Sequence, residues 1–150
     1  MVYSAWYELL PRNARTILSL DVSPGDQIQA FIQLVDSNFN RWAINVTDVT
    51  SGQSFQNSVV YLSSQLSAEW IVERPTVNRV LSSLANFGDT TLTNCMATID
   101  SVNGGISSFS VSRVVMVSSA ASGGGSVKLA DVSDLTPDGE GFTVTYLASS

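Results

Sequence analysis

Two glutamates in an otherwise apolar stretch are the residues whose types and spacing could do chemistry. They stand at the two ends of Glu69-Trp70-Ile71-Val72-Glu73. The run from residue 67 to residue 73 is predicted to be a strand. Arg74-Pro75 is expected to end that strand, because proline has no N–H group to donate to a sheet.

The alternation of side chains between the two faces of a strand decides whether these two carboxylates could act together. Successive side chains point to opposite faces, so Glu69, Ile71 and Glu73 are expected on one face, and Trp70 and Val72 on the other. At a rise of roughly 3.3 Å per residue, the carboxylates would lie about 13 Å apart. That distance is too long for a shared proton or for the paired carboxylates of a retaining glycosidase. They act separately, or they are simply solvated on an exposed face.

A second polar and aromatic segment lies near the start of the chain. In Tyr3-Ser4-Ala5-Trp6-Tyr7-Glu8, strand alternation would place Ser4, Trp6 and Glu8 on one face. Such a face suits a binding cleft, and it equally suits the half-exposed edge of a sheet. Trp6 and Glu8 are therefore candidate ligand-contacting residues.

Several kinds of chemistry are excluded by residues that the sequence does not contain. It has no histidine, which removes Ser-His-Asp and Cys-His mechanisms. Cys95 is the only cysteine, so no internal disulfide can form, and it is expected to be a buried, inert thiol. No metal site, Gly-rich phosphate loop or cofactor is predicted. Carboxylate chemistry, amide chemistry or binding remains.

The elements that must position these residues are short β-strands separated by turn residues. The expected strands are residues 2–8, 16–22, 27–36, 42–48, 54–61, 67–73, 90–99, 111–118, 126–132 and 141–147. Ser23-Pro24-Gly25-Asp26 predicts a type II turn, and residues 50–53 predict a hairpin turn. Residues 80–87 are expected to form a short helical turn or a loop. Regular short strands predict an all-β, antiparallel sandwich formed by residues 1–150 as a single domain.

The net charge of the chain limits the classes of partner that it is expected to bind. With 7 basic and 13 acidic residues, the net charge is −6, so the basic patch that nucleic-acid binding needs is not expected. No apolar run reaches the ~18 residues of a membrane span, and the first residues do not read as a signal peptide. Few basic residues also mean a modest positive charge in acid, which suits either an acid-adapted protein or an acidic protein of neutral solution.

The order of several motifs resembles the glutamic peptidase (eqolisin) family over nearly the whole chain. The segments that carry the resemblance are Tyr3-Ser4-Ala5-Trp6-Tyr7-Glu8, residues 22–28, residues 45–53, Ala68-Glu69-Trp70-Ile71-Val72-Glu73, residues 84–88, residues 91–95 and residues 143–147. The Ala-Glu-Trp-Ile-Val-Glu run is the most diagnostic of them. The resemblance implies a concanavalin A/lectin-like antiparallel β-sandwich of two curved sheets, with the N-terminal strands of the family fold missing.

The family's activity gives the candidate residues their expected roles. The resemblance implies an extracellular acid endopeptidase, insensitive to pepstatin, that acts on a peptide or protein substrate without a cofactor. Glu73 matches the catalytic glutamate, which serves as general base on water and then protonates the leaving amine. Trp6 is then expected to line the cleft, with Glu8 and Glu69 as neighbouring substrate-binding or supporting residues.

The sequence also departs from the family pattern. Ser4 replaces a cleft aspartate, and Arg74-Pro75 replaces an acidic-aromatic pair. The catalytic glutamine of the family, which donates to the oxyanion, lies in a segment that none of the glutamines here matches. The alternative is therefore an inactive β-sandwich that binds a peptide or sugar, or a homodimer formed through exposed edge strands.

One further motif is independent of the resemblance. Asn45-Val46-Thr47 fits the acceptor sequence for N-linked glycosylation, which is used only in a chain secreted by a eukaryote.

Overall fold

The computed structural model describes residues 3–77, 80–118 and 125–149. The regular structure in these residues is β-strand, apart from a 3-10 turn, η1 (Ile106–Ser108). The backbone falls into two compact units, residues 1–65 (unit 1) and residues 66–150 (unit 2). The recorded strand pairs are antiparallel, as predicted. In the described ranges, no helix has the length and apolar character to cross a membrane.

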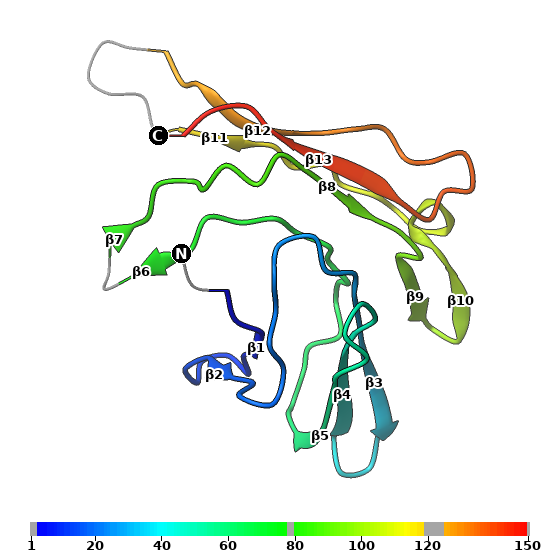
Figure 1. The fold of residues 1–150 in the computed structure, drawn as a ribbon. Helices are drawn as coiled ribbons and strands as arrows, with labels where there is room; N and C mark the ends of the chain where they lie inside the picture. The colour runs from blue at the N-terminus through cyan, green and yellow to red at the C-terminus, as the bar shows by residue number, and fades with distance from the viewer. Residues whose placement is uncertain (1–2, 78–79, 119–124, 150) are drawn as a thin grey trace. The chain divides into compact units, whose positions relative to one another are not determined.

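A meander of three strands forms the main sheet of unit 1 (Figure 1). These strands are β3 (Ile28–Asp36), β4 (Arg41–Asp48) and β5 (Ser54–Val60). The predicted strands at residues 27–36, 42–48 and 54–61 are confirmed to within one residue at each end. Because β4 pairs with both neighbours, Asn45 lies between Phe31 of β3 and Gln56 of β5.

The two faces of this sheet carry different residues. Side chains alternate along β4, so Ile44 and Asp48 share one face, here called the Ile44 face, and Asn45 and Thr47 share the other, the Asn45 face. Ile44 and Asp48 are buried. The apolar and polar alternation of β4 has therefore fixed which face is covered.

A short hairpin packs on the Ile44 face of unit 1. It consists of β1 (Trp6–Tyr7) and β2 (Arg15–Thr16). The Tyr7 ring stacks on Phe55 at 5.8 Å between centroids, and Asn57 Nδ2 donates to the Tyr7 hydroxyl at 2.9 Å. Phe55 and Asn57 lie opposite residues of β4 that share the Ile44 face. These contacts fix which side of β1 faces inward.

Both strands of this hairpin are shorter than the sequence predicts. The structure assigns two residues to each, against predictions of 2–8 and 16–22, of which Val2 lies outside the described residues. After β2 the chain turns, because Leu20 N–H donates to the Ile17 carbonyl at 3.4 Å. Ile17 and Leu20 are buried by this turn. The apolar pattern that predicts a strand here therefore reflects side chains that are buried in a loop.

The turn at residues 23–26 has the predicted type. Gly25 has a φ of 91°, and Asp26 N–H donates to the Ser23 carbonyl at 3.2 Å. A positive φ at the third position is what a type II turn requires, and glycine adopts it without steric cost. This turn leads the chain into β3.

A buried aspartate organises the predicted hairpin between β4 and β5. Asp48 is fully buried. Its carboxylate accepts hydrogen bonds from the Ser51 hydroxyl, from Thr50 N–H at 2.8 Å and from Ser51 N–H at 3.2 Å. The Ser51 hydroxyl and these N–H groups hold the pKa of Asp48 below its ordinary value, although burial acts in the opposite direction. The ionised carboxylate is thus the form that closes this turn.

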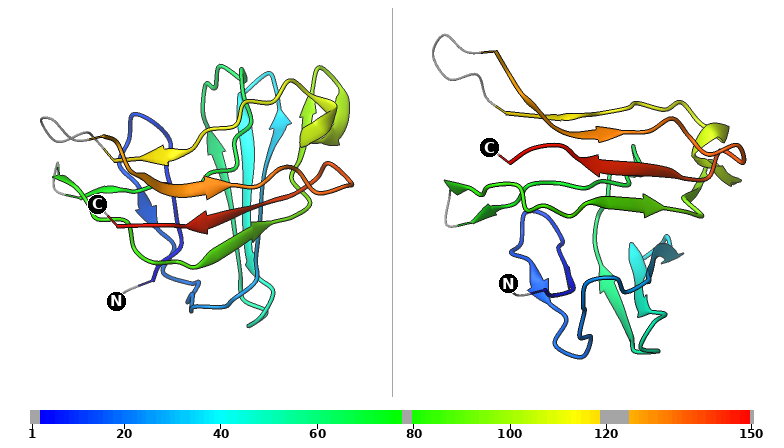
Figure 2. Two further views of the ribbon diagram at one scale, coloured as in Figure 1. Left: turned by 90° about the horizontal axis from the view of Figure 1, so that it is seen from above. Right: turned by 45° about the horizontal axis from the view of Figure 1, so that its top comes forward.

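The described residues of unit 2 form a four-stranded sheet and two hairpins (Figure 2). The sheet has the order β11 (Met116–Val117), β12 (Lys128–Val132), β13 (Phe142–Tyr146) and β8 (Asp89–Leu92). One hairpin pairs β6 (Thr76–Val77) with β7 (Val80–Leu81), and the other pairs β9 (Met96–Ile99) with β10 (Val102–Gly105). The strand predictions at 126–132 and 141–147 are confirmed within two residues.

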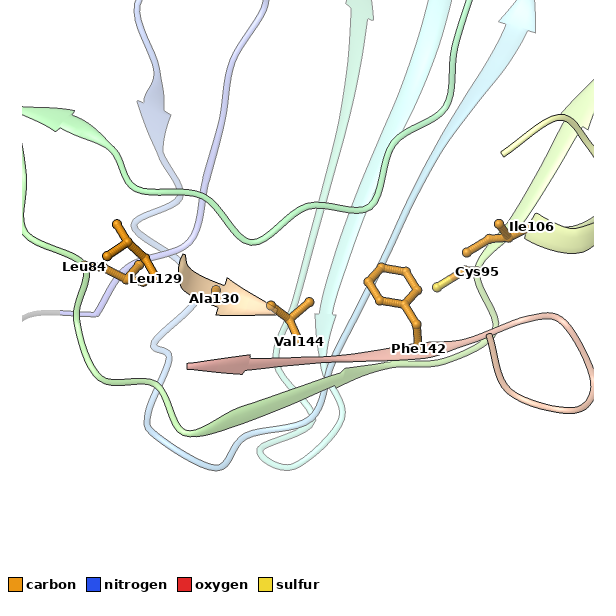
Figure 3. Close-up of a cluster of buried hydrophobic side chains, with 7 residues drawn as sticks. All are labelled: Leu84, Cys95, Ile106, Leu129, Ala130, Phe142 and Val144. Carbon is orange, nitrogen blue, oxygen red and sulfur yellow. The ribbon is translucent and has the colours of Figure 1, made fainter. Parts of the chain in front are cut away.

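The hydrophobic core of unit 2 lies against its sheet. In Figure 3 the buried side chains run from Leu84 and Leu129 through Val144 and Phe142 to Cys95. Leu129 is 0% exposed and Cys95 is 1% exposed. Burial raises the pKa of the Cys95 thiol, which keeps it protonated, as expected for an inert cysteine.

Three sequence predictions are wrong in unit 2. Residues 67–73 form no strand in the structure, and the strand predicted at 111–118 is reduced to β11. Of the two alternatives predicted for residues 80–87, a helical turn or a loop, the structure shows the loop, which follows β7.

The third wrong prediction is the strand at 90–99, which divides into β8 and β9. Asn94 has a φ of 52°, and Cys95 N–H donates to the Glu140 carbonyl at 2.7 Å. This kink changes the pairing partner of the chain from β13 to β10.

Truncating the centre of this core should destabilise the protein strongly. Leu129→Ala removes a fully buried side chain, and large-to-small changes in cores cost about 2–5 kcal/mol. We expect a loss of this size in the free energy of unfolding measured with urea. Leu66→Ala is the control, since Leu66 is 88% exposed, and an equal loss in both variants would contradict the assignment of the core.

The Asp48 turn should make stability depend on pH. A carboxyl group with a lowered pKa in the folded state stabilises fully above its unfolded pKa of about 3.9, and the stabilisation is lost as pH falls through the folded value. Asp48→Asn should therefore be less stable than the wild type near neutral pH, and the difference should shrink in strong acid.

Urea unfolding at several pH values from about 7 to 2 tests this linkage. The exposed Asp21 provides a matched control, Asp21→Asn. A deficit of Asp48→Asn that stays constant across this pH range would contradict the role given to the ionised carboxylate.

Candidate functional site

The segment that carries Glu73 is anchored by packing and not by a sheet. Residues 66–75 pair with no strand in the described part of the chain. Trp70 and Val72 are half-buried and pack against the core of unit 2. Glu69, Ile71 and Glu73 are exposed. The alternation of sides predicted from the sequence is therefore present, although the hydrogen-bonded strand is not.

A second contact ties down the C-terminal end of this segment. The Pro75 carbonyl accepts hydrogen bonds from Ser82 N–H at 3.1 Å and from the Ser82 hydroxyl at 2.8 Å. Glu73 is two residues before this point and one residue after Val72. Its backbone is thus held on both sides, while its side chain points away from the core.

The two glutamates of the segment differ in their contacts. Glu69 Oε1 accepts a hydrogen bond from the Ser67 hydroxyl at 3.1 Å. Within the described residues, no hydrogen bond or ion pair is recorded for the Glu73 carboxylate. The Glu73 carboxylate is accessible and open to a water molecule or a substrate, whereas Glu69 is engaged locally.

The N-terminal candidates lie on one side of β1 in unit 1. Tyr7 faces inward onto the sheet, so its neighbours Trp6 and Glu8 point the other way. Trp6 is 50% exposed, and Glu8 is also exposed. The structure therefore places Trp6 and Glu8 on one side of β1 in unit 1, and Glu69 and Glu73 on the exposed side of one segment in unit 2.

Sequence reasoning missed a surface hollow in unit 1. It is lined by Ala43 and Asn45 of β4 and by Gln56, Asn57 and Ser58 of β5. Its residues are uncharged. Gln56 and Ser58 share the Asn45 face with Asn45, whereas the side chain of Asn57 lies on the Ile44 face and donates to Tyr7. The polar residues at every second position could have pointed to this face, had the register of β4 and β5 been known.

No metal centre is found in the part of the chain that the structure describes. These residues contain no group of three or more histidine, cysteine, aspartate or glutamate side chains arranged to hold an ion. The chemistry offered by the described residues is that of individual carboxylates, amides and hydroxyls.

Comparison with known proteins identifies the family of the chain and agrees with its all-β architecture. The sequence profile of the Peptidase A4 family matches residues 1–145. The chain belongs to the Peptidase A4 family. The predicted relationship to the glutamic peptidases is thereby confirmed.

Two relatives from Aspergillus niger show how far the similarity extends. Aspergillopepsin-2 is 30% identical over 149 residues, which is 97% of this chain and 48% of that protein. The chain thus spans about half the length of that relative. The crystal structure of aspergilloglutamic peptidase superposes with a TM-score of 0.75 at 29% identity, covering 97% of this chain and 81% of that one. The predicted all-β sandwich class is confirmed by this match, and the single-domain assignment stays a prediction.

Substitutions of Glu73 and Trp70 should differ in the size of their effect on stability. Glu73→Gln removes a charge from an exposed side chain without recorded partners, so the free energy of unfolding should change by less than about 0.5 kcal/mol. Trp70→Ala removes a half-buried anchor and should cost roughly 2–4 kcal/mol. Urea unfolding measures both, and Ile71→Ala, in which Ile71 is 60% exposed, is the control for the anchor. A large loss in Glu73→Gln would contradict the open position of this carboxylate.

Proposed function

We propose that the chain is a glutamic-type endopeptidase domain in which Glu73 acts as general base and general acid. The observation that carries this proposal is the placement of Glu73, an accessible carboxylate on a segment anchored by Trp70, Val72 and Pro75. Membership of the Peptidase A4 family supports the reaction class. The activity of a whole family member is part of the proposal, because this chain covers about half of its relative.

Peptide hydrolysis by this residue would proceed in two steps. First, Glu73 takes a proton from water while the water oxygen attacks the peptide carbonyl carbon, giving a tetrahedral oxyanion. The oxyanion then collapses, the carbon–nitrogen bond breaks, and Glu73 passes its proton to the leaving amine. The products are a carboxylic acid and an amine, and Glu73 returns to its starting form.

An acid medium suits this chemistry and this chain. A carboxyl group works best as base and acid when the solution pH lies near its pKa, which for carboxyl groups is ordinarily in the acid range. With 7 basic residues and no histidine, the chain would carry only a modest positive charge after its carboxylates are protonated. We further propose that the protein acts outside the cell and is insensitive to pepstatin.

Two roles in the proposed site go to other residues. Trp6 and Glu8 would contact the substrate, and Glu69, held by Ser67, would support the segment. The oxyanion needs a hydrogen-bond donor, whose loss typically lowers turnover by 10²–10³-fold. We assign this role to none of the glutamines: Gln53 Oε1, for example, accepts a hydrogen bond from Asp21 N–H at 2.9 Å.

Cleavage of an unfolded protein substrate in acid tests the proposal. The wild type should cut with an optimum in acid in the presence of pepstatin, and Glu73→Gln should lower the rate by roughly 10²–10⁴-fold, since it removes the proton acceptor. The measurement is the rate at which new amino termini form. Pepstatin keeps a contaminating aspartic peptidase from contributing.

Asp21→Asn is the control, because it neutralises an exposed carboxylate that has no role in the proposed site. It should retain most of the activity. Equal rates in the wild type and Glu73→Gln would rule out the proposed base. If all three proteins are folded and none cuts, the peptidase proposal fails for this chain, and a β-sandwich that binds peptide or sugar becomes the better description.

A further inference from the structure

The hollow on the Asn45 face of unit 1 coincides with a modification motif that the proposed peptidase activity does not use. Asn45 opens the acceptor sequence Asn45-Val46-Thr47, and it also lines the hollow. We propose that Asn45 is the attachment site of an N-linked glycan whose first sugar rests on Phe31 and Gln56.

The pleat of β4 brings both required groups of the motif to one face of the sheet. Asn45 and Thr47 are two residues apart on a strand, so they share the Asn45 face, while Val46 lies on the Ile44 face. Among the described residues, none forms a recorded hydrogen bond with the Asn45 side chain. Its amide nitrogen is therefore not committed to the fold, unlike that of Asn57, which donates to Tyr7.

The neighbours of Asn45 supply the two kinds of contact that a sugar needs. Phe31 is its directly paired neighbour on β3 and is 54% exposed. Gln56 is its directly paired neighbour on β5. Paired residues of antiparallel strands have Cβ atoms ≈ 4.5–5.5 Å apart, so both side chains reach a group attached to Asn45. The ring offers an apolar surface, and the amide offers a donor and an acceptor.

The hollow suits an uncharged group of small size. Ala43, Gln56 and Ser58 line it beside Asn45, and none of these side chains is charged. Its volume of about 270 Å³ is just below the range of ≈ 300–1,000 Å³ that drug-sized ligands occupy. This volume accommodates one sugar ring attached to Asn45, and the rest of the glycan would extend into solvent.

The transfer itself needs a lipid-linked oligosaccharide as co-reactant. A bond forms between Asn45 Nδ2 and the first carbon of the sugar, and the bond from that carbon to the lipid pyrophosphate breaks. The amide nitrogen loses one proton, and the lipid pyrophosphate leaves. The reaction belongs to the secretory pathway of a eukaryotic cell, so the proposal applies to the exported protein.

Secretion from a eukaryotic host tests the attachment site directly. The wild type should gain a mass that N-glycosidase removes, and Asn45→Gln and Thr47→Ala should both lose it. Thr47→Ser keeps the acceptor sequence and should retain the added mass, which separates the motif from any effect of Thr47 on folding. The cell fraction is analysed with the medium, so that retained protein is also scored. A wild type of unmodified mass in both fractions would overturn the proposal.

A second measurement tests whether the sugar rests on the sheet. The melting temperature of glycosylated protein is compared with that of the same chain made in bacteria, where this transfer does not occur. The glycan should raise the midpoint in the wild type, and Phe31→Ala should abolish most of that rise. Phe39→Ala is the matched control, since Phe39 is 64% exposed and lies in the turn between β3 and β4. An unchanged rise in Phe31→Ala would show that the sugar does not use this ring.

Discussion

Packing of Trp70 and Val72 against the Leu129 core gives the Glu73 segment its fixed orientation. An extended chain outside a sheet has no ladder of hydrogen bonds to hold it, so its direction depends on side chains that are buried at every second position. Here the buried side is apolar and the exposed side carries Glu69 and Glu73. The two hydrogen bonds that Ser82 donates to the Pro75 carbonyl hold the C-terminal end of the segment in place. The candidate catalytic residue therefore depends on the hydrophobic core of unit 2, although it touches none of it.

This arrangement explains how far sequence reasoning could go. The period-two pattern of residues 69–73 correctly gave the side of each residue, because alternation follows from an extended backbone with or without a paired strand. The pattern could not reveal the missing partner, since pairing depends on residues distant in the sequence. In the same way, the strands of unit 1 from Ile28 to Val60 were predictable because tight turns join them. The division of residues 90–99 depends on the left-handed conformation of Asn94, which neighbouring residues do not signal.

The hollow beside Asn45 is defined by the register of strand pairing and not by the local sequence. Asn45, Phe31 and Gln56 are far apart in the sequence and become neighbours because β4 pairs with β3 and β5 in one register. A shift of a single residue would move Asn45 to the Ile44 face and bury its amide. Asp48 works against such a shift, since its carboxylate closes the hairpin that joins β4 to β5. The burial of Asp48 and the position of Asn45 in the hollow thus both follow from the register in which β4 pairs with β3 and β5.

The Asp48 turn also matters for the stability of the fold in acid. Carboxylates that accept hydrogen bonds keep their charge at lower pH than free ones. This holds for Asp48 at the hairpin after β4, for Asp131 within β12 and for Asp138 in the turn before β13. The Ser51 hydroxyl lowers the pKa of Asp48, Lys128 lowers that of Asp131, and the Thr136 hydroxyl lowers that of Asp138. The hydrogen bonds of these carboxylates are therefore kept to lower pH than those of a carboxylate with an ordinary pKa. A peptidase that uses a carboxyl group as base and acid works in that range, so its scaffold must keep its turns closed where its catalytic group changes charge.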